Sequence, residues 1–175
     1  MRAVVVYESM FGNTERVARA IADGLGAPGM AEMINVDDVE DLGEVDLLVV
    51  GGPTHAHGMT RARTRDEARR QAGKQDSAHG GVRSRTGIRD WLDALGPSTD
   101  GRAAAAFDTR FGKPRWLTGS AAVGAAKQLR RRGYRLVAQP ESFLVTGSAP
   151  GEHLRPGELA RAREWAAGLL VSTGR

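Results

Sequence analysis

Continuous apolar runs alternate with segments of helical periodicity along most of the chain. β-Branched and other apolar side chains make up most of residues 2–7 (RAVVVY) and 45–52 (VDLLVVGG), as they do in strands that are buried on both faces of a parallel sheet. Between these runs, apolar residues recur at spacings of three and four, as at Val17, Ile21 and Leu25. The pattern predicts alternating strands and helices, which is typical of an α/β fold.

The predicted elements are five strands and about four helices. Strands are expected at residues 2–7, 31–36, 45–52 and 102–108, with a last strand in two pieces, 134–138 and 142–146, that is broken near Pro140. The first helix should end at Gly24 or Gly26; others are expected at 87–95, at 120–132 and from Pro156 onward. The crossover between strands 2 and 3 should be short or absent. We therefore expect a doubly wound five-stranded parallel sheet with helices on both faces.

Residues 54–86 interrupt this pattern. They contain almost no large apolar side chains and are rich in Arg, Gly, Ser, Thr and Gln, so we expect a long exposed loop. Structureless loops of this length are uncommon in compact domains and are usually functional or disordered. We therefore expect a single domain over residues 1–175, with a basic loop insertion at about 56–86.

Composition changes this picture in two ways. The net charge of +4 is concentrated in residues 61–85, which carry eight basic and three acidic side chains, while the rest of the chain sums to −1. Cysteine is absent, which excludes disulfides, thiolate metal sites and cysteine nucleophiles. No window has the roughly 18 apolar residues of a membrane span, and the first apolar run is too short for a signal peptide, so we expect a cytoplasmic location.

Ligands of doubly wound sheets bind beyond the carboxyl ends of the strands, which directs attention to three loops. These are residues 9–14, the segment from Pro53 onward and residues 109–119. In the first loop, backbone N–H groups at a helix N-terminus, with Ser9, Asn13 and Thr14 as neutral donors, could hold a phosphate. The alternative is a ligand-free strand-to-helix turn that Asn13 or Thr14 caps.

The first loop also resembles a known family. Residues 4–18 (VVVYESMFGNTERVA) are similar to the opening of flavodoxins and related FMN proteins, and residues 49–55 (VVGGPTH) are similar to the strand and loop that flank their flavin. The resemblance extends more weakly through residues 106–109 and 119–122. It implies a flavodoxin-like fold, FMN as cofactor, and a phosphate loop of Ser9, Met10, Phe11, Gly12, Asn13 and Thr14. Phe11 replaces the usual hydroxyl residue and so removes one side-chain donor.

For the flavin ring, the resemblance implies contacts from the other two loops. It places Pro53, Thr54 and His55 along one side of the ring, with His57, Gly58 and Met59 close by. It places Asp108 and Thr109 near the polar edge of the ring. Trp116 is the candidate for a stacking aromatic. The alternatives are a solvated loop histidine for His55 and His57, and a surface anchor for Trp116.

Other proteins of the same architecture fit less well. Residues 51–53 (GGP) offer no aspartate for a phosphorelay receiver, and the cysteine of low-molecular-weight phosphatases is missing. The dinucleotide fingerprint Gly-x-Gly-x-x-Gly is also missing after the first strand. The four histidines show no metal-ligand spacing, and no general acid or nucleophile stands out, so we expect neither a metal site nor a catalytic side chain.

These observations lead to a flavodoxin-like redox protein that binds FMN and transfers electrons. An FMN-dependent quinone or protoporphyrinogen oxidoreductase, or an interaction protein without cofactor, would share the same motifs. The basic loop is either a solvated insertion or a lid or docking surface for an acidic partner or an anionic substrate. Nucleic acid is not an expected partner, because the basic segment lacks interleaved aromatics. The sequence leaves oligomeric state, electron donor and electron acceptor open.

Overall fold

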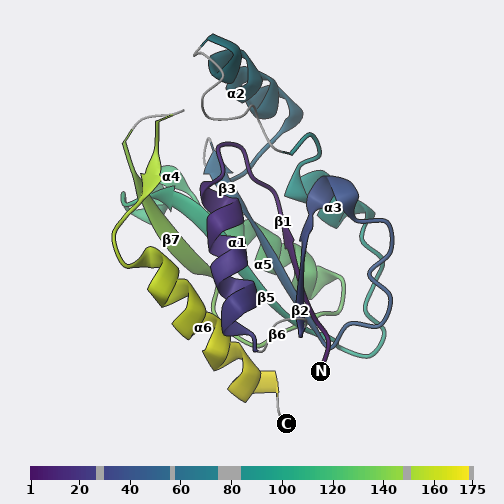
Figure 1. Cartoon of the computed structure of the whole chain (residues 1–175). Helices are drawn as coiled ribbons and strands as arrows, with labels where there is room; N and C mark the ends of the chain where they lie inside the picture. The colour runs from purple at the N-terminus through teal and green to yellow at the C-terminus, as the bar shows by residue number, and fades with distance from the viewer. Residues whose placement is uncertain (27–29, 56–57, 75–83, 148–150, 174–175) are drawn as a thin grey trace.

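A parallel sheet forms the centre of the molecule. The computed structural model describes residues 1–26, 30–55, 58–74, 84–147 and 151–173. Within these ranges, five parallel strands run in the order β2 (Ala31–Asn35), β1 (Ala3–Tyr7), β3 (Leu47–His55), β5 (Ala103–Phe111) and β7 (Glu141–Thr146). The five-stranded, doubly wound parallel arrangement that the sequence predicts is confirmed (Figure 1).

Three short strands extend this sheet. The two-residue strand β4 (Gly58–Met59) pairs antiparallel with β3, and β8 (His153–Leu154) pairs antiparallel with β7. β6 (Arg135–Leu136) pairs parallel with β5 just before β7 does, so the last strand is broken in two as predicted. The sequence analysis missed β4 and β8, because two-residue strands carry no periodicity.

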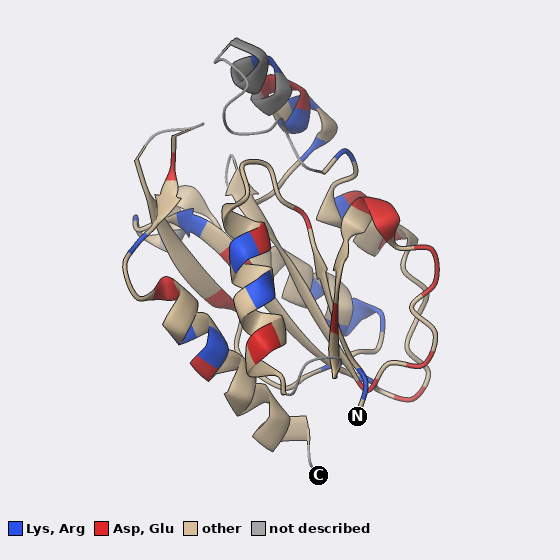
Figure 2. Cartoon of the chain, viewed as in Figure 1, with Lys and Arg blue, Asp and Glu red and all other residues tan. Residues whose placement is uncertain are grey.

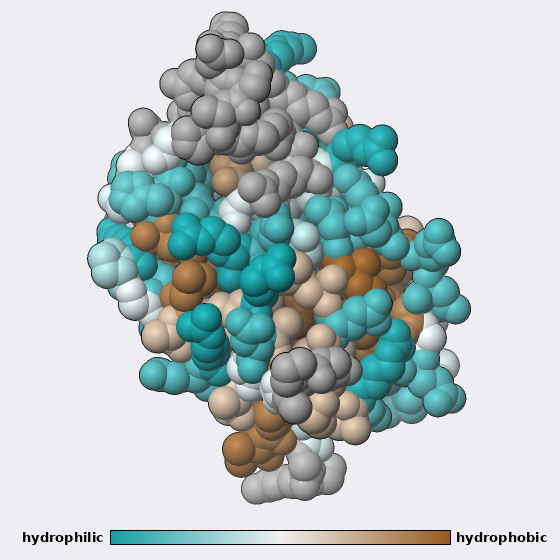
Figure 3. Space-filling model, in the orientation of Figure 1, coloured by the Kyte–Doolittle hydropathy of each residue, from teal (hydrophilic) through white to brown (hydrophobic). Residues whose placement is uncertain are grey.

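Helices cover both faces of the sheet (Figure 1). α1 (Asn13–Gly24) and α6 (Glu158–Thr173) pack on one face, and α3 (Ile88–Ala94) and α5 (Ala121–Arg131) pack on the other. The alternation of the strands divides the apolar side chains between two cores: Val5 contributes to the core under α1 and α6, while Val4 contributes to the core under α3 and α5. Hydrophilic side chains cover most of the face in Figure 3, with hydrophobic side chains in smaller patches.

Several boundaries differ from the prediction by a few residues. β3 continues to His55 and β5 to Phe111, so Pro53, Thr54 and Thr109 lie in strands and not in loops. α6 begins at Glu158, two residues after Pro156. The crossover from β2 to β3 contains only the 3₁₀ turn η1 (Val36–Asp38) in its described part, which agrees with the predicted short connection.

The prediction of a structureless loop over residues 54–86 is wrong. This segment contains the helix α2 (Ala62–Lys74), which stands at the carboxyl edge of the sheet (Figure 1). The sequence of α2, ARTRDEARRQAGK, has good helix formers but no apolar stripe, so a search for hydrophobic periodicity could not find it. A second missed helix is the short α4 (Arg115–Thr118). Within the described ranges, no helix has the length and apolar character that a membrane crossing requires.

Candidate functional site

The three predicted loops meet at the carboxyl edge of the sheet. Strand pairing places Tyr7 opposite Gly51 and Pro53 opposite Thr109, so the loops that follow β1, β3 and β5 begin side by side. Two side-chain hydrogen bonds connect them. Thr14 Oγ1 and Thr109 Oγ1 lie 2.8 Å apart, and Thr54 Oγ1 donates to Asp108 Oδ2 at 2.9 Å. Loops that are separate in the sequence thus form one continuous site.

The first loop is a tight turn that leads directly into α1. Gly12 is the N-cap residue and has φ of +91°, a left-handed conformation that favours glycine. Ser9 Oγ, inside the turn, accepts from the backbone N–H of Gly12 at 3.1 Å and from that of Glu15 at 3.4 Å. The alternative in which Asn13 or Thr14 caps the helix is wrong: both are helical residues, and no side chain caps Gly12.

The other polar side chains of this loop have partners within the protein. Asn13 Nδ2 donates to the backbone oxygen of Glu152 at 2.9 Å, and the hydroxyl of Thr14 is shared with Thr109. Met10 is buried, and Phe11 is half-buried. Side chains therefore hold the loop in shape. Ser9 Oγ takes the N–H groups of Gly12 and Glu15, so the other N–H groups of the first turn of α1 are the donors for a ligand.

This geometry fits a phosphate group. A helix N-terminus carries a partial positive charge and several N–H donors. Here the N-cap residue is a glycine without a side chain, and Ser9 Oγ takes the first-turn N–H of Glu15. The turn is fixed by Ser9 from within, and glycine at the cap lets an anion approach the backbone. Among the described residues, no three His, Asp or Glu side chains are grouped as metal ligands would be.

The second loop is the hairpin between β3 and β4. Pro53 is buried, while Thr54 accepts from the backbone N–H of Ala121 at 2.8 Å and so joins the N-terminus of α5. His55 is half-buried at the end of β3 and pairs with Gly58 across the hairpin. His57, which was expected nearby, lies outside the described residues.

The third loop starts from a buried carboxylate. Asp108 is fully buried, and its Oδ2 accepts from Thr54, from the hydroxyl of Ser120 at 2.6 Å and from the backbone N–H of Ala122 at 3.0 Å. Its Oδ1 is buried with no hydrogen-bond partner among the described residues. Asp108 thus has one oxygen engaged at the start of α5 and one with accepting capacity left.

Trp116 lies farther along this loop and is 85% exposed. It therefore does not anchor the loop by burial. Two neighbouring side chains, Phe111 and Leu117, are also exposed. Arg110 holds the loop instead: its Nη1 donates to the backbone oxygens of Phe111 and Lys113, at 3.2 and 2.7 Å, and to Thr118 Oγ1 at 3.0 Å.

Sequence reasoning missed three residues behind the first loop. Glu8 is fully buried, Arg65 is 5% exposed and Ser84 is 1% exposed, although all three are polar and two carry formal charges. Burial raises the pKa of the Glu8 carboxyl above its usual value. The available signal was Glu8 itself, a carboxylate that directly follows a strand buried on both faces. Its side-chain partner Thr60 and the nearby cation Arg65 could not be found because they come from the segment expected to be a loop.

Comparison with known proteins finds similarity to flavodoxins in sequence and in fold. Residues 5–85, which include the first two loops, match the model of the flavodoxin family. Oxidised flavodoxin 1 from Bacillus cereus is similar in fold, with 19% identity, 98% of each chain covered and a TM-score of 0.66. A flavodoxin from the domain Archaea has 21% identity, 100% coverage of both chains and the same TM-score.

A more distant structure is the flavodoxin, WrbA-like protein from Agrobacterium tumefaciens. It has 17% identity and a TM-score of 0.54, and the alignment covers 98% of this chain and 96% of that one. No curated protein sequence matches the chain significantly. The resemblance to flavodoxins is therefore confirmed, by sequence over residues 5–85 and by fold over the whole chain.

Proposed function

We propose that this protein binds FMN non-covalently and acts as an electron-transfer protein. The observation that carries the proposal is the turn at Ser9–Gly12, which presents the N-terminus of α1, with glycine as its N-cap residue, at the carboxyl edge of a flavodoxin-type sheet. It lies within the segment that matches the family model. FMN supplies the redox chemistry when bound, and the protein supplies binding, orientation and electrostatics.

In this proposal the phosphate end of FMN is held by the first loop. The backbone N–H groups at the start of α1 bind the phosphate oxygens, with Ser9, Asn13 and Thr14 fixing the turn around them. Met10 and Phe11 complete the loop, and the missing hydroxyl at Phe11 leaves more of the binding to the backbone.

The ring end is held by the other two loops. Pro53, Thr54, His55 and Gly58 of the β3–β4 hairpin line one side of the ring, and Trp116 stacks from the third loop. Asp108 and Thr109 lie near the polar edge, where the unpartnered Oδ1 of Asp108 supplies an acceptor. A buried acceptor without a partner is costly unless a donor reaches it, which supports this role.

We further propose an acidic protein or an anionic small molecule as redox partner. α2 stands at the same edge of the sheet as the three loops and carries basic side chains that reach solvent, interspersed with acidic ones (Figure 2). Of the described side chains in and next to α2, Arg61, Arg63 and Arg70 are exposed. Positive charge beside the site raises the association rate of anions and favours the anionic form of reduced flavin.

The visible absorption spectrum of the purified protein tests the main proposal. We expect flavin bands, and we expect FMN to be released when the protein is denatured. A colourless preparation should quench the fluorescence of added FMN. A colourless protein that leaves FMN fluorescence unchanged would contradict the proposal and favour the interaction protein without cofactor. Steady-state reduction of a quinone or oxidation of protoporphyrinogen would favour the enzyme over the carrier.

A further inference from the structure

Both ends of the basic insertion return to the residues that begin the first loop. On the outgoing side, Thr60 Oγ1 donates to Glu8 Oε1 at 2.6 Å. On the returning side, Ser84 forms two hydrogen bonds with Ser9: its hydroxyl accepts from Ser9 N at 2.9 Å, and its N–H donates to Ser9 O at 3.0 Å. Four residues that bracket the insertion and the loop are thus joined directly.

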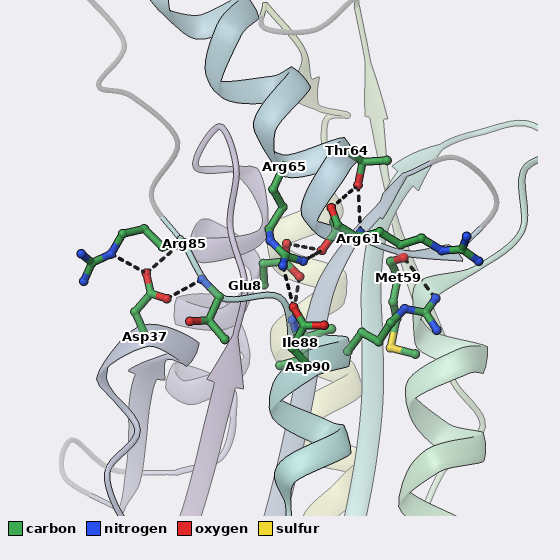
Figure 4. Close-up of polar contacts among 12 residues, drawn as sticks. Glu8, Asp37, Met59, Arg61, Thr64, Arg65, Arg85, Ile88 and Asp90 are labelled. Carbon is green, nitrogen blue, oxygen red and sulfur yellow. Dashed lines mark hydrogen bonds and ion pairs between the residues drawn. The ribbon is translucent and has the colours of Figure 1, made fainter.

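From α2, Arg65 joins the group of bonded residues around Glu8 (Figure 4). Its Nη1 donates to Thr60 Oγ1 at 3.1 Å, and its Nη2 donates to Asp90 Oδ2 at 2.5 Å. Thr60 in turn donates to Glu8, while Glu8 Oε2 accepts from the backbone N–H of Ile88 at 2.9 Å. Arg65 therefore supports the carboxylate of Glu8 through one hydroxyl.

The protein leaves space for the guanidinium of Arg65. Gly87, just before α3, lies against it, and a Cβ atom at Gly87 would clash with Arg65 Nη1. Of the α2 side chains that the structure describes, Arg65 is the buried one, with 5% of its surface exposed. Among the described side chains of α2, Arg65 is thus the buried one, and its guanidinium lies in the space beside Gly87.

Glu8 needs this support because it is fully buried. A buried carboxylate is costly unless it is hydrogen-bonded and lies near positive charge. Its two oxygens accept from Thr60 and Ile88, and Arg65 is the nearby cation. Glu8 also directly precedes Ser9, whose hydroxyl holds the turn at Gly12. A displaced Glu8 would move the first residue of the loop.

We propose that Arg65 is a positioning residue for the phosphate loop: through Thr60 it holds Glu8, and Glu8 fixes where Ser9 and the following backbone N–H groups lie. This inference rests on the proposed FMN function for its ligand but concerns contacts within the protein alone. It makes the basic insertion part of the cofactor site and not an appendage beside it.

The test compares Arg65→Met with Arg63→Met, which removes an exposed arginine from the same helix. Two quantities are measured: the dissociation constants of FMN and of riboflavin, and amide hydrogen exchange of residues 9–14 without flavin. Riboflavin lacks the phosphate, so it separates an effect on the phosphate loop from an effect on the whole site. Arg65→Met should weaken FMN binding by about tenfold, the scale of one lost charged hydrogen bond, and leave riboflavin binding within about twofold.

Exchange of the loop amides should accelerate by about tenfold in Arg65→Met and stay unchanged in Arg63→Met. Equal weakening of FMN and riboflavin, or loop exchange equal to that of Arg63→Met, would overturn the inference. If the unaltered protein bound no FMN, the proposed function would fail, while the exchange measurement would still decide the role of Arg65.

Two milder variants keep the test informative if Arg65→Met does not fold. Arg65→Lys retains the charge, but one ammonium group does not reproduce the two-armed contact with Thr60 and Asp90, so its effects should fall between those of the other two proteins. Gly87→Ala fills the recess and should displace the guanidinium, giving the same pattern as Arg65→Met. Loop exchange at the unaltered rate in both variants would contradict the positioning role.

Discussion

The two ends of the candidate flavin site are built in opposite ways. At the phosphate end, Ser9, Asn13 and Thr14 are buried and bonded to residues from three other parts of the chain, Ser84, Glu152 and Thr109. At the ring end, the loop after β5 exposes Trp116 and Leu117, at 85% and 47%. A buried, bonded loop can hold an anion in one geometry, whereas an exposed aromatic loop leaves a ring accessible to a second molecule. The contrast suits a carrier that retains its cofactor at one end and exchanges electrons at the other.

The largest change in stability is expected from a substitution of Glu8, which lies behind the buried phosphate end of the site. Glu8→Ala leaves Thr60 and the N–H of Ile88 without their acceptor and leaves Arg65 with one charge partner fewer. The free energy of unfolding should fall by about 3 kcal/mol. Urea unfolding measures this loss, and Glu44→Ala, at an exposed carboxylate, is the control.

The loss in the free energy of unfolding caused by Glu8→Ala should also depend on pH. Burial raises the pKa of Glu8 in the folded state, so the folded protein binds this proton more tightly than the unfolded chain does. The contribution of Glu8 to stability is therefore fully present below its unfolded pKa and declines as pH rises through the folded pKa. The difference between the two proteins should shrink as pH rises. A difference that widens with pH would contradict a raised pKa of Glu8 in the folded state.

A second, smaller effect is expected from Gly12. Alanine at φ of +91° is strained, so Gly12→Ala should lower the free energy of unfolding by about 1–2 kcal/mol. Because the strain lies in the phosphate turn, FMN should also bind about tenfold more weakly. The matched control is Gly157→Ala, where φ is +84° and a Cβ would meet open space. Gly157→Ala should lose a similar free energy of unfolding and bind FMN with unchanged affinity. An equal loss of FMN affinity in both variants would contradict a role of the Gly12 turn in FMN binding.

The sequence predicts those features of the molecule that are formed by residues close together in the chain. The parallel strands and the helices α1, α5 and α6 were predictable because each buries an apolar run or stripe, such as Val17, Ile21 and Leu25. The turn between β1 and α1 was predictable because a strand, a glycine turn and a helix follow each other directly. These features depend on local order in the chain.

Features that depend on distant contacts were not predictable. The buried residue among the described side chains of α2 is Arg65 and not an apolar residue, and the sequence of α2 has no apolar stripe, so periodicity offers no signal for this helix. The partners of Glu8 come from residues 60 and 88, and nothing in the sequence pairs them with β1. Thr109 was expected in a loop but extends β5, because pairing with Pro53 continues the strand beyond its apolar run.

At the ring end, Trp116→Ala should affect binding without affecting the fold. An 85% exposed side chain contributes little to folding, so the free energy of unfolding should change by less than about 0.5 kcal/mol. If Trp116 stacks on the flavin, FMN should bind more weakly by about 0.5–1.5 kcal/mol, and the visible flavin bands should shift. Leu117→Ala in the same short helix is the control. Unchanged affinity and an unchanged spectrum in Trp116→Ala would remove Trp116 from the site.

The smallest effect is expected from the exposed arginines beside the site. Arg61→Glu with Arg63→Glu reverses two charges near the carboxyl edge, and Arg130→Glu with Arg131→Glu makes the same change in the last turn of α5, at the opposite edge. Flavin-loaded protein reduced with dithionite would be mixed with ferricyanide, an anionic acceptor. The first pair should slow its reduction about threefold at low salt and weaken the salt dependence, because long-range attraction is screened beyond about 10 Å at 0.1 M salt.

The α5 pair should have less effect on ferricyanide, and a cationic cobalt complex should respond to the α2 pair in the opposite direction. That reversal matters because a general loss of reactivity would slow both acceptors alike. Equal rates in both double variants would show that only the net charge of the protein acts. The role of the basic insertion would then be limited to the contacts of Arg65 behind the first loop. The exposed arginines beside the site would have no part in selecting the redox partner.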